Sequence, residues 1–168
     1  MKKILLSKTT WGVLIVLVLL IGMLIPSRIC ITLTPSLNKR VFWMSHNVEN
    51  IQRNDYVLFS LDTGRLSPDI SIPDDVRKGD EVRAMKRVAC VTGDLLKVDG
   101  QDYFCNESFI GHSKLLSIKG KKLTPFTYNG IVPEGLVFLI GDHPDSYDSR
   151  YYGFIDRMTF QAHAWPIF

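Results

Sequence analysis

The segment Val82-Arg-Ala-Met-Lys-Arg-Val-Ala-Cys-Val91 is the most informative strand candidate in the sequence. Successive side chains of a strand point to opposite faces, so Lys86 shares a face with four apolar neighbours: Val82, Ala84, Val88 and Cys90. The other face carries Arg83 and Arg87 and is expected to be the wetter one. Burial lowers the pKa of a lysine, and a lysine changed in this way can act as a general base. The alternative is a lysine near a strand end whose stem lets the ammonium reach water.

Short runs of β-forming residues flank this strand on both sides. The predicted strands cover residues 55–61, 82–91, 95–98, 103–105, 135–140 and 157–168. A turn at Asp99-Gly100 joins two of them as a hairpin, and residues 64–79 form a polar loop. No helix of ten or more residues is expected after residue 28. The body of the chain, from residue 29 onwards, is therefore predicted to be mainly β and to form one domain.

The first 28 residues differ from this body. Three lysines precede an uncharged, largely apolar stretch, residues 9–27, which is about long enough to cross a bilayer as a helix. Ile25-Pro-Ser-Arg28 offers a poor cleavage site, so a retained anchor is favoured over a cleaved signal peptide. The basic residues before the span place the N-terminus in the cytoplasm. We expect residues 1–28 to form a cytoplasmic N-terminus and a single transmembrane helix in a bacterial inner membrane, and residues 29–168 to form a periplasmic domain.

The charge distribution and the metal-binding residue types exclude several classes of protein. Residues 1–48 carry six basic side chains and no acidic one, whereas the remaining 120 carry fourteen basic and seventeen acidic, a net charge of −3. The body therefore lacks the basic surface of a nucleic-acid-binding protein. Three cysteines and four histidines fit no metal-binding spacing. No phosphate-binding loop or dinucleotide fingerprint is present, so we expect no metal and no cofactor.

Cys90 and Cys105 lie fifteen residues apart, at opposite ends of the hairpin region. In an oxidising compartment they could form a disulfide, and closing a loop of that size stabilises a fold by about 3 kcal/mol in the chain-entropy model. The alternative is a pair of buried free thiols.

Two polar segments also have ordinary explanations. Ser36 follows a proline and could belong to a simple turn. The carboxylates of Asp142, Asp145 and Asp148, with His143, could form a loop that binds a cation.

Four segments, in the right order along the chain, resemble the type I signal peptidase family. Gly141-Asp-His-Pro-Asp-Ser-Tyr-Asp-Ser-Arg-Tyr-Tyr-Gly-Phe154 is similar to the C-terminal signature of that family. Met85-Lys-Arg-Val-Ala-Cys-Val-Thr-Gly-Asp94 resembles its lysine box, and Gln52-Arg-Asn-Asp-Tyr-Val-Leu-Phe59 the strand before that box. Thr34-Pro-Ser36 lies where the family has its nucleophilic serine. The resemblance implies a signal-peptidase-like β domain behind the anchor.

The resemblance also implies a role for each matching residue. Ser36 matches the nucleophile and Lys86 the base of a Ser-Lys dyad, which needs no histidine. The Thr34 hydroxyl and the Ser36 backbone N–H match the oxyanion hole. Ser146 matches the hydroxyl that orients the lysine. Asp148 and Arg150 match a pair that holds this segment against the dyad.

Departures from the housekeeping pattern resemble the conjugal-transfer signal peptidases (TraF type), which mature pilin precursors and in some members join the pilin ends into a ring. These departures are Leu37-Asn38 after the serine, the short spacing from Asp142 to Asp148, a single span, and a short segment between the last two boxes. The expected partners are a pilin or another exported precursor, membrane lipid, and components of a conjugative transfer apparatus. The alternatives are a general signal peptidase and a non-catalytic, anchored assembly subunit of such an apparatus.

Overall fold

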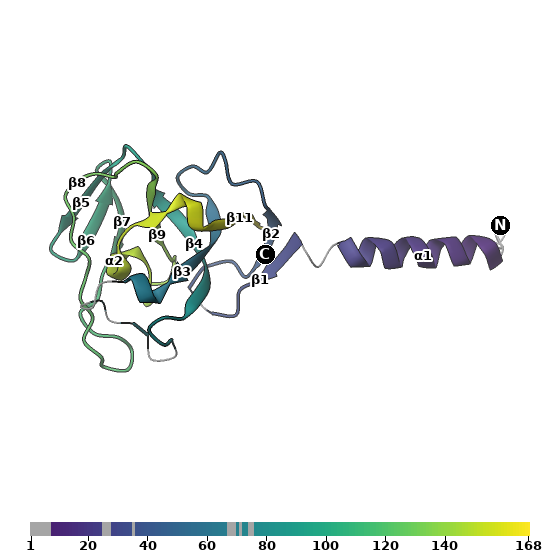
Figure 1. The fold of residues 1–168 in the computed structure, drawn as a ribbon, viewed down its shortest axis with the longest axis horizontal. Coiled ribbons are helices and arrows are strands. Elements are labelled where there is room, and N and C mark those ends of the chain that lie inside the picture. Colours follow the sequence, from purple (N-terminus) through teal and green to yellow (C-terminus); the bar gives the residue numbers. More distant parts are fainter. Residues whose placement is uncertain (1–7, 25–27, 35, 67–69, 71, 74–75) are drawn as a thin grey trace, which may run out of the picture.

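The structure is a computed structural model, and it describes residues 8–24, 28–34, 36–66, 70, 72–73 and 76–168. One long helix, α1 (Lys8–Leu24), extends away from a β-rich body, and the C-terminus lies at the side of the body that faces it (Figure 1). Among the described residues, no helix has both the length and the apolar character needed to cross a membrane. Parts of the predicted anchor, residues 1–7 and 25–27, lie outside the described residues.

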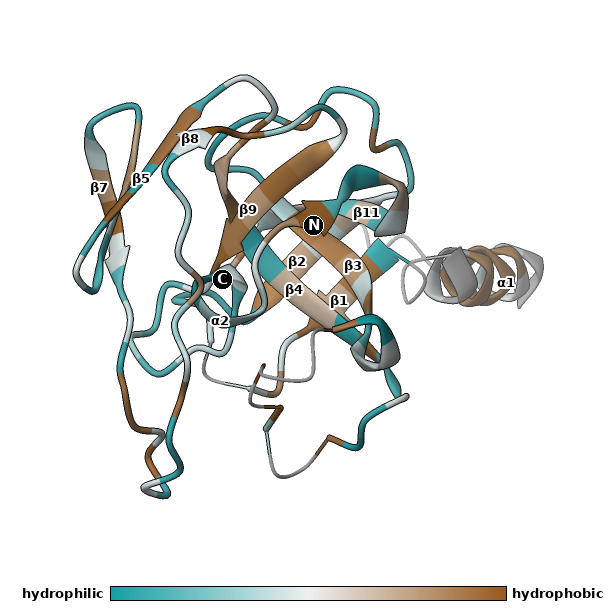
Figure 2. Cartoon of the chain, turned by 60° about the vertical axis from the view of Figure 1, so that its left-hand side comes forward, coloured by the Kyte–Doolittle hydropathy of each residue, from teal (hydrophilic) through white to brown (hydrophobic). Residues whose placement is uncertain are grey.

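The larger of two antiparallel sheets carries Lys86 on one of its inner strands. Its strand order is β1-β2-β11-β3-β4-β9-β10, so β11 inserts between β2 and β3. The strands are β1 (Ile29–Ile31), β2 (Val41–Ser45), β3 (Tyr56–Asp62), β4 (Glu81–Cys90), β9 (Leu136–Ile140), β10 (Ile155–Asp156) and β11 (Phe160–Pro166). In Figure 2 strands β3 and β9 are among the most apolar stretches of the body, and both contribute to the core.

The smaller sheet packs beside the end of β4. Its strands are β5 (Leu95–Asp99), β6 (Asp102–Cys105), β7 (Ser108–His112) and β8 (Gly130–Ile131), in the order β7-β6-β5-β8. The hairpin predicted at Asp99-Gly100 is confirmed, since Asp99 pairs with Asp102 and Gly100 has a φ of 61°, which glycine adopts without strain. Among the residues that the structure describes, the body also has three short helices: η2 (Thr63–Arg65), α2 (Ser149–Tyr152) and η3 (Arg157–Thr159).

The mainly β architecture is confirmed, and the predicted strands lie within one or two residues of β3, β4, β5, β6 and β9. The closing strand begins three residues later than predicted, because 157–159 forms η3. The expectation of a wet second face on β4 is wrong for Met85 and Ala89, which are buried. Met85 packs against Leu37 and Phe42, so the segment after Ser36 covers that face of the strand.

Candidate functional site

Lys86 lies at the centre of the large sheet, on β4 opposite Val57 of β3. Its side chain is only 6% exposed, and its Nζ donates a hydrogen bond to Ser146 Oγ at 2.9 Å. Burial is the main effect that lowers the pKa of Lys86; Asp148 and Asp142 raise it, the Arg150 guanidinium lowers it, and the net result is a pKa of about 8. A strand alternation that buries a lysine thus produces an amine that can lose its proton near neutral pH.

Ser36 and Thr34 lie on the segment between β1 and β2, and Pro35 between them is outside the described residues. The two hydroxyl oxygens are 3.3 Å apart, within hydrogen-bond distance. The Ser36 carbonyl accepts the N–H of His143 at 3.2 Å, which fixes this segment against the 141–146 turn. Thr34, Ser36, Lys86 and Ser146 all line one cavity of about 390 Å³.

This cavity is mostly apolar, and a smaller set of polar side chains, among them those of Ser36 and Lys86, completes its wall. Its apolar lining comes from both sheet strands and loops, and includes Leu61, Leu66, Val82, Ala84, Ile118 and Tyr152. The two candidate dyad residues line the same cavity, but each contacts a different neighbour. Lys86 Nζ donates to Ser146 Oγ, and Ser36 Oγ lies within hydrogen-bond distance of Thr34 Oγ1. A mostly apolar pocket with a few converging polar groups is the usual form of a binding site.

Asp148 and Arg150 form a buried ion pair below Ser146. Their side chains are 0% and 4% exposed, and Arg150 Nη2 donates to Asp148 Oδ2 at 2.6 Å. Asp148 Oδ2 also accepts the Gly141 N–H at 2.8 Å, while Arg150 Nη2 donates to the Ser146 carbonyl at 3.2 Å. Arg150 Nη1 reaches the carbonyl of His112 at the end of β7. The pair therefore holds the turn that carries Ser146 and links it to the smaller sheet.

Gly141 is the point where the Ser36 and Ser146 segments meet. A Cβ added there would lie 2.1 Å from Ser146 Oγ and 2.7 Å from the Ser36 carbonyl oxygen, both shorter than any real contact. The absence of a side chain at residue 141 is therefore what allows the two segments to approach. Sequence reasoning singled out the motif but not this requirement.

Asp142, the next residue, joins three other segments, a role that the sequence did not predict, since it offered Asp142 only as part of a cation-binding loop. Its Oδ1 accepts Arg87 Nε at 2.8 Å, and its Oδ2 accepts the Asn38 N–H at 3.2 Å and the Tyr56 hydroxyl at 3.1 Å. It thus fixes the chain just after Ser36 to β3 and β4. Sequence separations of 55, 86 and 104 residues hide these contacts from any local pattern.

The carboxylates considered for a cation loop are each paired with a different cation. Asp142 pairs with Arg87, Asp148 with Arg150, and Asp145 with Lys114. The hydrogen bond and charge of Lys114 hold the pKa of the Asp145 carboxyl below its usual value. The arrangement is one of ion pairs that fix the turn.

Strand β4 offers an open edge beside the cavity. Strand β9 pairs with β4 only at Arg87, Val88 and Cys90. In the part of the chain that the structure describes, no strand pairs with Glu81–Lys86 on the side away from β3. Unpaired backbone groups at such an edge can bind an extended peptide as an added strand.

Cys90 and Cys105 are joined in the structure by a disulfide, with their Cα atoms 5.9 Å apart. The bond ties the end of β4, four residues after Lys86, to β6 of the smaller sheet. Both sulfur-bearing side chains are fully buried. The disulfide therefore links the strand of Lys86 to the smaller sheet, whose strand β7 also accepts a hydrogen bond from Arg150.

Comparison with known proteins gives one family. The family profile described as Signal peptidase, peptidase S26, matches residues 4–168. No curated protein matches the chain in sequence. Among solved structures, a signal peptidase I from Enterococcus faecalis V583 is 22% identical; the match covers 70% of this chain and 98% of that chain, with a TM-score of 0.41. The profile match extends over nearly the whole sequence.

Proposed function

The chain belongs to the signal peptidase family, peptidase S26, and from this membership we propose a serine endopeptidase in which Ser36 is the nucleophile and Lys86 the general base. The observation that carries the dyad is the buried Lys86 amine, with its pKa lowered to about 8, in the cavity that Ser36 also lines. At pH 7 about a tenth of such an amine is neutral, against about 0.04% of an ordinary lysine.

The reaction follows from the groups around this cavity. The neutral Lys86 amine turns from Ser146 toward Ser36 and takes the hydroxyl proton as Ser36 Oγ attacks the substrate carbonyl. The Thr34 hydroxyl and the Ser36 N–H stabilise the developing oxyanion. The Lys86 ammonium then gives its proton to the leaving amine, and water hydrolyses the ester that remains on Ser36. Ser146, fixed by Arg150, keeps the amine oriented between these steps.

The substrate is an exported precursor that binds as an extended strand along the open edge of β4. Val82 and Ala84 of this strand line the same cavity as Lys86. The residues before the cut therefore place their side chains in the cavity, and the scissile carbonyl lies next to Ser36. Residues 29–168 form the peptidase domain in this proposal.

Membrane attachment through residues 1–28 completes the proposal, with the N-terminus in the cytoplasm and the peptidase domain in the periplasm. The described helix α1 is apolar, and its residues 10–20 and 22 are exposed. Strands β1, β2 and β11 add exposed apolar side chains: Ile31, Trp43 and Trp165. Tryptophan favours the membrane interface, so this edge of the sheet suits contact with lipid. Alkaline extraction of membranes, which releases peripheral proteins only, tests the anchor.

We propose a conjugative pilin precursor as the substrate, because the departures around Ser36 and between Asp142 and Asp148 resemble the conjugal-transfer branch. The ester on Ser36 can pass to water or to the α-amine of the same pilin. A docked amine competes with water because of its high effective concentration, and its pKa near 8 leaves a useful neutral fraction. The second route joins the two ends into a ring.

The deciding experiment measures the intact mass of a pilin precursor co-expressed with the full chain. Wild type is expected to yield a shortened product, and Ser36→Ala and Lys86→Met none. Lys97→Met, on the exposed face of β5, is the matched control and should keep activity. A product one water lighter than the linear chain identifies ring closure. An uncut precursor with wild type, together with intact transfer function in both dyad variants, would establish the non-catalytic alternative.

A further inference from the structure

A second cavity, of about 200 Å³, lies directly beside the candidate active-site cavity. Five residues line both cavities: Ile72, Pro73, Ile118, Asp145 and Tyr147. Because the cavities share this wall, an extended chain bound at Ser36 can continue into the second cavity without leaving the protein surface. Sequence reasoning gave this region no role.

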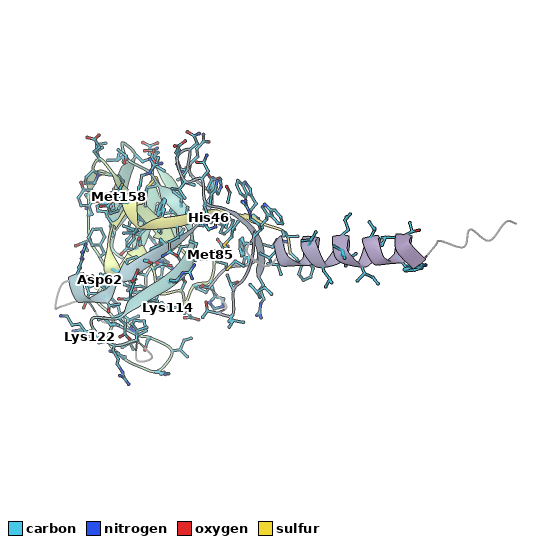
Figure 3. The ribbon with its side chains drawn as sticks, turned by 45° about the vertical axis from the view of Figure 1, so that its right-hand side comes forward. His46, Asp62, Met85, Lys114, Lys122 and Met158 are labelled. Carbon is cyan, nitrogen blue, oxygen red and sulfur yellow. A yellow bond between two sulfur atoms is a disulfide. The ribbon has the colours of Figure 1, made fainter. Side chains whose placement is uncertain are left out.

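The outer wall of the second cavity is a short hairpin, residues 115–123. The Leu123 N–H donates to the Leu115 carbonyl and the Ser117 N–H to the Lys121 carbonyl. Lys121 Nζ crosses to the Ile72 carbonyl at 2.8 Å, which ties the hairpin to the opposite side of the cavity. Figure 3 marks the two ends of this region with Lys114 and Lys122. Hydrogen bonds within the hairpin and across the cavity therefore hold this wall in a defined shape.

The cavity is lined mainly by apolar groups. The rings of Tyr147 and Tyr151 lie parallel, at 4° and 5.5 Å between centroids, and give it a flat aromatic side. Leu116, Ile118 and Leu123 line the hairpin side, and the Lys114–Asp145 ion pair stands at the boundary with the active-site cavity. An apolar cavity of about 150 Å³ can hold a benzene ring. The second cavity thus has room for one large apolar side chain.

The exposure of the hairpin supports binding there. Leu116 is 58% and Ile118 82% exposed, although both line the cavity. Adjacent exposed apolar side chains at the rim of a cavity are typical of a binding site. The Lys114–Asp145 pair neutralises itself; Lys119 and Lys121 also line the cavity, and Lys121 Nζ donates to the Ile72 carbonyl.

We propose that this second cavity is a substrate subsite that takes a large aliphatic or aromatic side chain of the precursor, at a position outside the two residues that flank the cut. The occupant is the precursor itself, since the cavity continues from the active site through shared walls. This inference rests on the proposed function. Removing the favourable burial of one such side chain should lower kcat/KM about 10-fold to 100-fold, chiefly through KM.

The test uses the full chain in detergent and a set of synthetic peptides based on a cleaved sequence, with Leu, Phe, Ala or Ser at each of six positions on either side of the cut. Leu116→Asp places a charge in the subsite. Leu115→Asp is the matched control, because Leu115 is its neighbour on the hairpin, is 52% exposed, and lines neither cavity. Labelling of Ser36 by a small fluorophosphonate, which needs no subsite, reports the dyad separately.

The expected result is a preference of wild type for Leu or Phe at one position beyond the flanking residues. Leu116→Asp should lose that preference about 10-fold or more, with Ser36 labelling unchanged, and Leu115→Asp should keep it. Equal preferences in all three proteins, or none in wild type, would overturn the subsite and leave the dyad intact. Absence of both cleavage and Ser36 labelling in wild type would instead refute the proposed function, and the subsite with it.

Discussion

Replacing Gly141 by alanine adds one methyl group and removes no functional group, which makes it a sharp test of the site geometry. The added Cβ would lie 2.1 Å from Ser146 Oγ, and ordinary contact begins near 3.4 Å. Ser146 Oγ must therefore shift by about 1.3 Å. The Ser36 carbonyl, at 2.7 Å, must shift by about 0.7 Å. Both movements act on groups proposed for catalysis, one on the partner of Lys86 and the other on the nucleophile segment.

A displacement of about 1 Å in a catalytic group costs on the order of 100-fold in rate. We therefore expect Gly141→Ala to lower kcat/KM about 100-fold or more, mostly through kcat. Overpacking of a buried site also destabilises a protein, typically by about 1–3 kcal/mol. Steady-state kinetics on a cleaved peptide and urea unfolding of the same preparation separate the two effects.

Gly111→Ala is the matched control, because a Cβ at residue 111 meets Arg150 at an ordinary 3.7 Å. It should leave both rate and stability close to wild type. Activity of Gly141→Ala within about threefold of wild type, in a folded protein, would refute the reasoning. It would mean that the contact between the Ser36 and Ser146 segments is not needed for the reaction.

Further predictions concern the buried charges. The kcat/KM of wild type should rise with pH through an apparent pKa near 8, as Lys86 loses its proton; a flat profile between pH 6 and 10 would exclude lysine as the base. Because the pKa of Lys86 is lowered by folding, the unfolded chain binds more protons between about pH 8 and 10.5, and the free energy of unfolding should rise with pH over that window. Lys86→Met removes this cost, so below pH 8 it should raise the free energy of unfolding by up to about 3 kcal/mol while abolishing activity; a loss of stability in denaturant titrations would contradict this. Asp148→Ala leaves Arg150 buried without its partner and should lower the free energy of unfolding by about 3–5 kcal/mol, whereas equal stability of Asp148→Ala and wild type would show that water compensates the charge.

The alternation along β4 placed Lys86 among apolar neighbours, because the two-residue period of a strand is a local property. The hairpin at Asp99-Gly100 was predictable for the same reason. The alternation left open a lysine whose ammonium reaches water, and only the resemblance of the surrounding segments favoured the buried base. The prediction that Arg83 and Arg87 mark a solvent-exposed face was wrong at Met85. The segment after Ser36 packs over Met85, and the sequence of the strand alone does not indicate this contact.

The contacts of Asp142 could not be predicted from local pattern. They depend on which strands neighbour one another, and in this sheet β11 comes between β2 and β3. The close approach at Gly141 is of the same kind, because it joins Ser36 to Ser146 across more than 100 residues of sequence. The wall of the second cavity is tied by the hydrogen bond from Lys121 Nζ to the Ile72 carbonyl, and a local sequence pattern does not predict this contact.

The position of β11 has a consequence for the timing of activity. Residues 160–166 separate β2, which follows Ser36, from β3, which leads to β4 and Lys86. Until β11 has been synthesised and has paired with both strands, β2 and β3 have no common neighbour in the sheet, and nothing in the sheet holds the segment of Ser36 against the strand of Lys86. Such distant pairings form late in folding. The proposed dyad is therefore expected to assemble only after β11 has paired with both β2 and β3.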